Sequence, residues 1–150
     1  MFTGRYALAM DDKGRVAVPA LYRAQLTKME GVPLYLTPYD SDEGRSYVAV
    51  YPSPRFEELA EEIEAIDDAD ERELLMEEVL GGSIMVDFDA QGRIVLPAVL
   101  RERVGLKGRV VIEGQRRRFD IWDEATLQRR ENEKQADRQR LSSALKRIRR

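Results

Sequence analysis

Short apolar strands and amphipathic helices alternate along the chain, and their order is the same in its two halves. In the first half, alternating apolar positions and flanking Gly and Pro residues predict a strand, a strand, a helix and two further strands at 3–9, 15–18, 19–28, 32–37 and 47–51. In the second half, the same order of elements falls at 83–88, 93–96, 97–104, 109–113 and 118–122. We therefore expect two copies of one α+β unit that share a core.

The two halves also share a sequence motif. Residues 10–23 and 88–101 align without a gap, and both contain Asp-x-x-x-Arg with Gly before the Arg. In the first copy these residues are Asp11, Gly14 and Arg15, and in the second they are Asp89, Gly92 and Arg93. Internal duplication of this kind indicates a protein built from two similar units, too few for an open solenoid.

The motif has a local structural explanation. Asp accepts hydrogen bonds from backbone N–H groups two residues further on, and Gly adopts a positive φ without a Cβ clash. We therefore predict that each motif is the tip of a β-hairpin formed with the strand before it. Each tip presents one arginine beside its own aspartate. Lys13 adds a positive charge to the first tip, where the second has Gln91.

Charged helical segments connect and follow the two units. Helices are predicted at 56–63, with Ser53 as N-cap, and at 71–80, while 38–45 has the composition of a loop. A last helix begins after Asp123 and has almost no apolar stripe until Leu141, so we expect it to pack weakly. The predicted division is a first repeat at 1–52, an acidic helical connection at 53–81, a second repeat at 82–125 and a charged helix or tail at 126–150.

The net charge of −3 conceals a strong separation of charge. Residues 51–80 hold Arg55 and Arg72 against twelve Asp or Glu, whereas residues 101–150 hold sixteen Lys or Arg against eight Asp or Glu. Such asymmetry suggests a part that faces a polyanion and a separate acidic part, although both could also be solvated helices. The basic tail could bind phosphates or the acidic helices at 57–78 of a neighbouring protomer, and the second use also explains the acidic block.

The composition argues against several classes of site. The chain has no Cys and no His, so disulfides, the usual zinc ligands and the usual general base are missing. Residues 87–92 imitate the opening of a calcium loop, but its twelfth position is Ala98 instead of Glu. No apolar run is long enough to cross a membrane, and the start lacks a signal-peptide pattern. We expect a cytoplasmic protein that is not an enzyme, with no cofactor, no metal and no small-molecule substrate.

On these residues the chain resembles the MraZ family of bacterial transcriptional regulators. The likeness rests on the opening Met1-Phe2-x-Gly4, on both Asp-x-x-Gly-Arg motifs with the prolines that follow them, and on Phe119-x-Ile121-Trp122-Asp123. The resemblance implies a duplicated, pseudo-two-fold, swapped-hairpin β-barrel of the AbrB-like or SpoVT-like type (a double-split barrel), with peripheral helices and a C-terminal helix. It also implies a nucleoid-associated protein that assembles into rings.

The resemblance further implies double-stranded DNA as the partner, in the form of promoter repeats upstream of a cell-division and cell-wall gene cluster. The DNA-binding residues would then be those of the two tips. Arg15 and Arg93 would contact bases or phosphates, Asp11 and Asp89 would orient them, Lys13 would add charge, and Gly14 and Gly92 would shape the turns.

Other interpretations of the same residues stay open. The Asp–Arg pairs could only fix the register of each hairpin. Arg23 and Arg101 recur on the short helices, where we expect a solvated or ion-paired role, and the cluster 116–118 could face nucleic acid or belong to a turn. Two rival functions are an antitoxin-like or scaffold module that binds proteins through charged helices, and a Mg²⁺ enzyme, which requires about three converging carboxylates.

Overall fold

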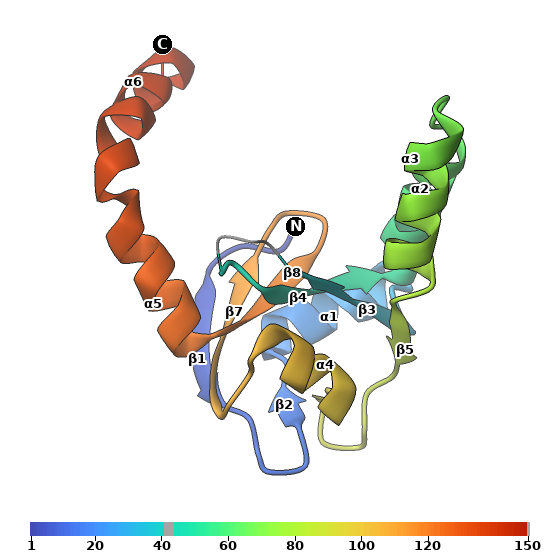
Figure 1. Ribbon diagram of the computed structural model, residues 1–150. Helices are drawn as coiled ribbons and strands as arrows, with labels where there is room; N and C mark the ends of the chain where they lie inside the picture. The colour runs from blue at the N-terminus through green and yellow to red at the C-terminus, as the bar shows by residue number, and fades with distance from the viewer. Residues whose placement is uncertain (41–43, 150) are drawn as a thin grey trace.

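The computed structural model describes residues 1–40 and 44–149 and combines antiparallel sheets with helices, which confirms the α+β class (Figure 1). The strands are β1 (Arg5–Ala9), β2 (Arg15–Ala17), β3 (Leu34–Tyr39), β4 (Tyr47–Pro52), β5 (Ile84–Val86), β6 (Arg93–Val95), β7 (Arg109–Gly114) and β8 (Phe119–Asp123). The α-helices are α1 (Ala20–Lys28), α2 (Ser53–Glu64), α3 (Ala69–Leu75), α4 (Ala98–Val104), α5 (Glu124–Glu133) and α6 (Arg138–Ile148). A π-helical turn, η1 (Met76–Leu80), continues α3, and a 3₁₀ turn, η2 (Lys134–Asp137), joins α5 to α6.

The strands form one large and one small sheet. The large sheet has six antiparallel strands in the order β1-β7-β8-β4-β3-β5, and β2 and β6 form a separate two-stranded ribbon. Exchanging the two repeats replaces β1, β3 and β4 by β5, β7 and β8, and this leaves the strand order unchanged. In the ribbon, Val16 lies opposite its repeat equivalent, Ile94. The strand order is thus symmetric between the two repeats.

The prediction of two hairpins is wrong. Each motif does turn the chain, but the strands on either side of it join different sheets: β1 pairs with β7, β5 pairs with β3, and β2 pairs with β6. Every one of these pairings joins one repeat to the other. Alternating hydrophobicity identifies the buried face of a strand but not its partner, and a short turn between two strands favours the nearest strand in sequence.

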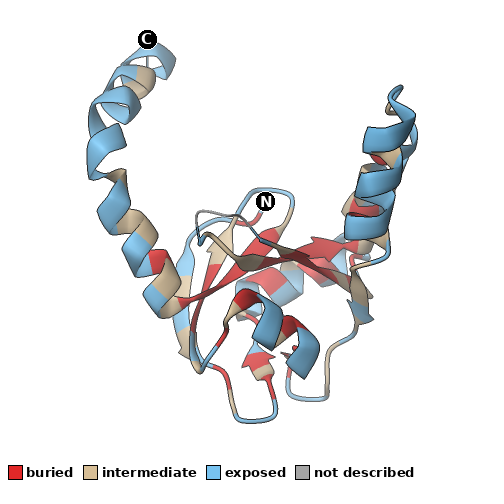
Figure 2. Cartoon of the chain, in the orientation of Figure 1, coloured by how far each residue is buried: buried red, intermediate tan, exposed pale blue. Residues whose placement is uncertain are grey.

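Both faces of the large sheet are covered (Figures 1 and 2). On one face, α1, α4 and the ribbon contribute Tyr22, Leu100 and Ile94 to the main core. On the other face, α2 and η1 cover β3 and β4, while Leu127 of α5 packs against β7 and β8. The fold therefore places the ribbon on one side of the sheet and α2, α3 and α5 on the other.

Because both faces of the sheet are covered, strand β8 is buried on both of its faces. Phe119 and Ile121 point into the main core, and Asp120 and Trp122, which alternate with them along the strand, are buried as well. Arg118 Nε donates to Asp120 Oδ1 at 2.8 Å, which gives the buried carboxylate a charged partner. Burial raises the pKa of Asp120, and Arg118 opposes that rise.

The acidic helices differ from the prediction in two details. Ser53 is the first residue of α2 and not its N-cap, because its hydroxyl donates to the carbonyl oxygen of Pro33 instead of capping the helix. Asp68 does cap α3, and its carboxylate accepts from the backbone N–H groups of Asp70 and Glu71. Leu74 was expected on an apolar face, yet it is 61% exposed.

Two further segments extend or limit the predictions. The expected loop 38–45 begins later, because Pro38 and Tyr39 belong to β3, and residues 41–43 of that loop lie outside the described residues. The last helix is divided by η2 into α5 and α6, and it projects away from the body (Figure 1). No residue of α6 is buried, which fits the weak packing expected from its composition.

Candidate nucleic-acid interface

The first motif forms a tight turn at residues 11–15, which we call turn 1. The Asp11 carboxylate accepts from the backbone N–H of Arg15 at 2.8 Å and of Lys13 at 3.1 Å. Gly14 closes the turn with φ of 82° and donates its N–H to the carbonyl oxygen of Asp11 at 3.0 Å. The same aspartate receives Arg15 Nε at 2.5 Å. One carboxylate thus fixes both the backbone of the turn and the side chain of its arginine.

The second motif repeats this arrangement in turn 2, at residues 89–93. Asp89 accepts from the backbone N–H of Arg93 and of Gln91, both at 2.9 Å, and from Arg93 Nε at 2.8 Å. Gly92 has φ of 75°. The two turns therefore present their arginines in the same way, and the predicted Asp–Arg pairing is confirmed in both.

Hydrogen bonds lower the pKa of both aspartates. For Asp11 the main cause is the backbone N–H of Arg15, and for Asp89 it is the backbone N–H of Arg93; the guanidinium groups add to the effect. The carboxylates are therefore ionised at neutral pH and hold the arginines by charge-assisted hydrogen bonds.

The outer ends of the two guanidinium groups differ slightly. In the part of the chain that the structure describes, both terminal nitrogens of Arg15 have no partner, since only its Nε is bonded. Arg93 Nη2 donates to Gln91 Oε1 at 3.2 Å, which leaves Nη1 without a partner among the same residues. The Gln91 side chain therefore helps to hold its arginine in place. The Lys13 side chain is exposed, and Lys13 contributes to its turn only through the hydrogen bond of its backbone N–H to Asp11. Arg15 therefore has two terminal nitrogens that no described residue binds and that are free to donate to another molecule, whereas Arg93 has one.

The ribbon brings the two turns together. Leu96 N donates to Gly14 O at 2.8 Å, and Val18 N donates to Gly92 O at 3.3 Å, so each turn is bonded to the strand end of the other repeat. Val16 and Ile94 are fully buried beneath the ribbon. Because side chains alternate along a strand, Arg15 and Arg93 both lie on its outward face. As diagonal neighbours across the ribbon, their Cα atoms are about 7–8 Å apart.

Arg23 and Arg101 brace this arrangement. Arg23 Nε donates to Val18 O at 3.2 Å, and Arg101 Nε donates to Leu96 O at 2.9 Å. Each guanidinium also lies against the turn of the other repeat: a Cβ added at Gly14 would meet Arg101 Nε at 2.7 Å, and one added at Gly92 would meet Arg23 at 2.8 Å. Arg23 is exposed, which agrees with the expected solvated role, and Arg101 is half-buried; neither forms an ion pair among the described residues, and each also bonds a backbone carbonyl.

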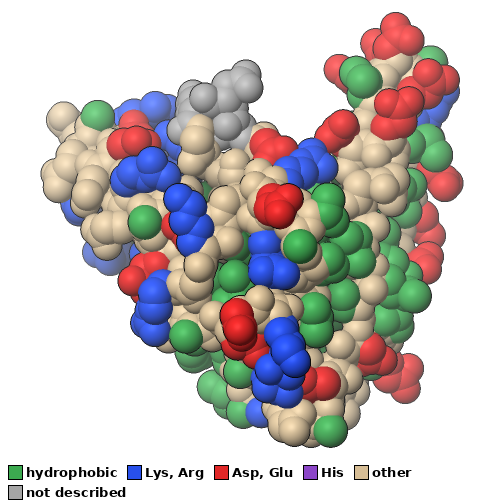
Figure 3. Space-filling view, turned by 60° about the horizontal axis from the view of Figure 1, so that its bottom comes forward, with side chains coloured by type: hydrophobic (Ala, Val, Ile, Leu, Met, Phe, Trp, Pro, Cys, Tyr) green, Lys and Arg blue, Asp and Glu red, His purple; other side chains and the backbone are tan. Residues whose placement is uncertain are grey.

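The exposed surface at this end of the molecule carries both charged and apolar side chains. Figure 3 shows acidic and basic side chains next to one another, with apolar side chains beside them. Leu21 and Val99 occupy equivalent places at the start of α1 and α4, and both are exposed, as is Val95 on the ribbon. The sequence gives no signal for this exposure, because the helical period does not distinguish a buried start of a helix from an exposed one.

The basic cluster 116–118 is used elsewhere. Arg117 forms an ion pair with Glu58 of α2, and Arg118 is paired with Asp120 and lies over the ring of Tyr51. The β7–β8 loop that carries these residues stands at the end of the body opposite the two turns (Figure 1). This cluster therefore does not extend the surface formed by turns 1 and 2.

Residues 1–40 and 44–149 contain no group of three or more Asp or Glu side chains arranged to hold a metal ion. The Mg²⁺ enzyme hypothesis therefore lacks its required feature in the described part of the chain. None of the described helices is both long and apolar enough to cross a membrane.

Comparison with known proteins identifies relatives over most of the chain. A family model described as "MraZ protein, putative antitoxin-like" matches residues 1–35 and 79–148. A protein of Marinobacter nauticus is 33% identical over 124 residues, covering 82% of this chain and 81% of its own length. Proteins of Alcanivorax borkumensis and Thioalkalivibrio sulfidiphilus are each 36% identical, over 83% and 84% of this chain and over 84% and 82% of their own lengths. All three carry the name "Transcriptional regulator MraZ".

Proposed function

The chain belongs to the MraZ family, and from that membership we propose that it is a DNA-binding transcriptional regulator and not an enzyme. The relatives' names support the class of function. The finer proposal concerns the site: the protein binds repeated promoter elements of a cell-division and cell-wall gene cluster through turns 1 and 2. We place it in the cytoplasm, on the nucleoid.

One observation carries this proposal. Arg15 and Arg93 stand on the outward face of one two-stranded ribbon, and each is held by an aspartate through Nε. This leaves both terminal nitrogens of Arg15 and Nη1 of Arg93 for an external partner. A two-stranded ribbon fits the major groove of B-DNA, and an arginine fork matches guanine O6 and N7 or a phosphate.

The remaining candidate residues have supporting roles in the proposal. Asp11 and Asp89 orient the arginines, Gly14 and Gly92 allow the turns to close, and Lys13 adds phosphate contact at turn 1. Arg23 and Arg101 are positioning residues, since they brace the turns through backbone carbonyls. Because Lys13 has Gln91 as its counterpart, we expect turn 2 to add less affinity than turn 1.

A single copy offers few basic contacts, so its affinity for one repeat is low. Assembly into a ring would place several copies on successive repeats and raise affinity through effective concentration. The duplicated swapped-hairpin barrel and the division at 1–52, 53–81, 82–125 and 126–150 complete the proposal. The symmetric strand order supports the barrel.

Fluorescence anisotropy tests the proposal directly. A duplex from the gene's own upstream region is compared with a scrambled duplex at two salt concentrations. Arg15→Ala and Arg93→Ala should each cost about 1–3 kcal/mol on the native duplex and reduce the preference for it. A lost phosphate contact would also lower the salt slope by about 0.9. Arg129→Ala, an exposed arginine of α5, is the control and should change neither quantity.

The alternative function is a protein-interaction module, and the charged helices outside the core are the observation that favours it. Such a module would bind both duplexes weakly and equally. If Arg15→Ala and Arg93→Ala leave specific DNA binding unchanged, the Asp–Arg pairs serve only to fix the turns and DNA is bound elsewhere. If the wild type already binds both duplexes weakly and equally, the protein-interaction module replaces the DNA-binding function.

A further inference from the structure

Two charged arms project from the body on the side opposite turns 1 and 2 (Figure 1). The acidic arm comprises α2, α3 and η1 (residues 53–80), and the basic arm comprises α5, η2 and α6 (residues 124–148). The acidic arm has twelve Asp or Glu and only Arg55 and Arg72 as cations. The arms stand at opposite sides of the body, so the basic arm lies away from the acidic arm of its own chain.

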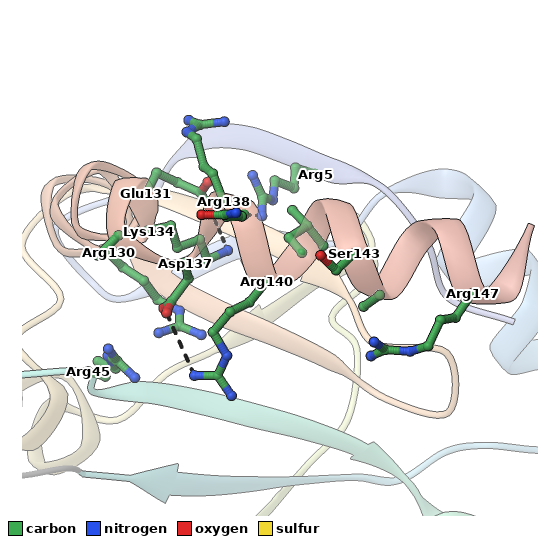
Figure 4. Close-up of a pocket in the computed structure, with 14 residues that line it drawn as sticks. Arg5, Arg45, Arg130, Glu131, Lys134, Asp137, Arg138, Arg140, Ser143 and Arg147 are labelled. Carbon is green, nitrogen blue, oxygen red and sulfur yellow. Dashed lines mark hydrogen bonds and ion pairs between the residues drawn. The ribbon is translucent and has the colours of Figure 1, made fainter.

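The basic arm forms one wall of a hollow of about 1060 Å³ against the body. Seven Lys or Arg side chains line this hollow, against Glu131 and Asp137 as the acidic members. Figure 4 shows Arg140 and Arg147 projecting from the same side of α6. Arg130 and Arg147 have no hydrogen-bond or ion-pair partner among residues 1–40 and 44–149, and Arg140 reaches Asp137 only at 4.0 Å. The hollow thus has more cationic than anionic lining side chains, and Arg130 and Arg147 are not neutralised by any residue in the described part of the chain.

Both arms also expose apolar side chains. Leu141 and Ala144 line the hollow, and Leu141 is 56% exposed. On the acidic arm, Leu74, Leu75 and Met76 are exposed at the junction of α3 and η1, next to Glu73 and Glu77. Neither α3 nor α6 has a buried residue. Exposed apolar side chains bordered by charges are typical of surfaces that bind another protein.

We propose that the hollow of the basic arm binds the acidic arm of a second copy of this chain. Leu74 and Leu75 would pack on Leu141 and Ala144, and the glutamates beside them would pair with Arg140 and Arg147. The inference deepens the assembly part of the proposed function by naming its interface. Because the contact joins two different surfaces, it is head-to-tail, and repetition of it closes a ring or extends a filament.

The apolar wall distinguishes this occupant from nucleic acid. A phosphate backbone would match the arginines but not Leu141 and Ala144, whereas the α3–η1 junction matches both. Turns 1 and 2 also lie at the other end of the body, so the hollow does not continue the proposed DNA-binding surface.

Charge reversal with rescue tests the interface in the full-length protein. Variant A carries Arg140→Glu and Arg147→Glu, and variant B carries Glu73→Arg and Glu77→Arg; all four side chains are exposed, and circular dichroism verifies folding. Light scattering after size-exclusion chromatography should give the wild type as an assembly and each variant as a single chain. Mixing A with B should restore the assembly, as should a chain carrying all four changes. Arg129→Glu, on α5 but outside the hollow, should keep the wild-type mass.

Any of three results overturns the interface: a monomeric wild type, a folded variant A that keeps the wild-type mass, or folded variants that fail to restore assembly when mixed. Binding to a duplex with one repeat separates this inference from the DNA-binding proposal. Variant A should bind that duplex as the wild type does. If it loses binding while keeping its mass, the hollow is a nucleic-acid surface, and the test of Arg15 and Arg93 stands unaffected.

Discussion

Gly14 and Gly92 occupy equivalent places in the two turns but have different neighbours. A Cβ at Gly14 would lie 2.4 Å from the backbone oxygen of Leu96, while the three atoms nearest to a Cβ at Gly92 all belong to the guanidinium of Arg23, at 2.8 Å. The backbone of Leu96, whose N–H donates to Gly14 O, cannot withdraw without breaking that hydrogen bond, whereas the end of an arginine side chain can move. The same motif therefore has different tolerance in its two copies.

We predict that Gly14→Ala destabilises the protein more than Gly92→Ala does. Replacing a glycine of left-handed conformation by alanine lowers the free energy of unfolding by roughly 1–2 kcal/mol. Overpacking adds about 1–3 kcal/mol at Gly14. Gly105→Ala is the control, since its φ is 72° but nothing lies near its Cβ position. Urea unfolding measures the free energy of unfolding of each variant. If Gly14→Ala and Gly105→Ala lower it equally, turn 1 does not pack tightly against Leu96.

The aspartates of the turns should make stability depend on acid pH. Their pKa is lowered by folding, so their contribution is fully present above the ordinary carboxyl value of 3.8 and is lost as the pH falls through the folded-state value. The unfolding free energies of the wild type and of Asp11→Asn/Asp89→Asn should therefore converge below about pH 3.8. A gap between the two proteins that stays constant well below that pH would contradict the account.

At the scale of elements, the fold depends on pairing between the repeats. Ladder hydrogen bonds join β1 to β7, β3 to β5, β4 to β8 and β2 to β6, so only β3–β4 and β7–β8 are pairs within one repeat. Each repeat alone would leave the apolar underside of its ribbon strand without a partner. The unit that folds is thus the pair of repeats.

Neither repeat should fold alone. Fragments 1–81 and 82–150 should each give collapsed, poorly dispersed amide NMR spectra, and mixing them should restore dispersion and β-sheet circular dichroism. The reason is that β2 and β6 complete each other's ribbon. A well-dispersed spectrum for either fragment alone would refute this interdependence.

These pairings between the repeats could not be predicted from the sequence. The strands fell close to their observed bounds, and the Asp–Arg pairs and the glycine turns were correct, because each depends on residues adjacent in sequence. The hairpins were wrong because the partner of β1 is β7, more than a hundred residues away. The bracing contact of Arg23 and Arg101 could not be predicted for the same reason, since the turn that each braces belongs to the other repeat.

At the scale of the whole molecule, two surfaces lie at opposite ends of one body. In the proposed account, the turns present two arginines to DNA, and the arms at the other end of the body present complementary charges for assembly (Figure 1). Few contacts per copy make single-site binding weak, and linked copies on adjacent repeats gain affinity by effective concentration. The two surfaces should therefore be separable by mutation.

Deletion of residues 138–150 tests that separation. No residue of α6 is buried, so the body should keep its thermal midpoint and its affinity for a duplex with one repeat. Affinity for a duplex with several repeats should fall by about a hundredfold or more, because avidity is lost. An equal loss on both duplexes would mean that the basic arm contacts DNA directly.

The most direct test of the central claim is chemical protection of individual arginines. Full-length protein is treated with phenylglyoxal alone, with the native duplex or with the scrambled duplex, and modification at each arginine is quantified by peptide mass spectrometry. We predict that the native duplex protects Arg15 and Arg93 strongly, that the scrambled duplex does so weakly, and that Arg129 reacts equally in all three. If Arg15 and Arg93 stay as reactive on the native duplex as in free protein, the turns do not read DNA and the account fails.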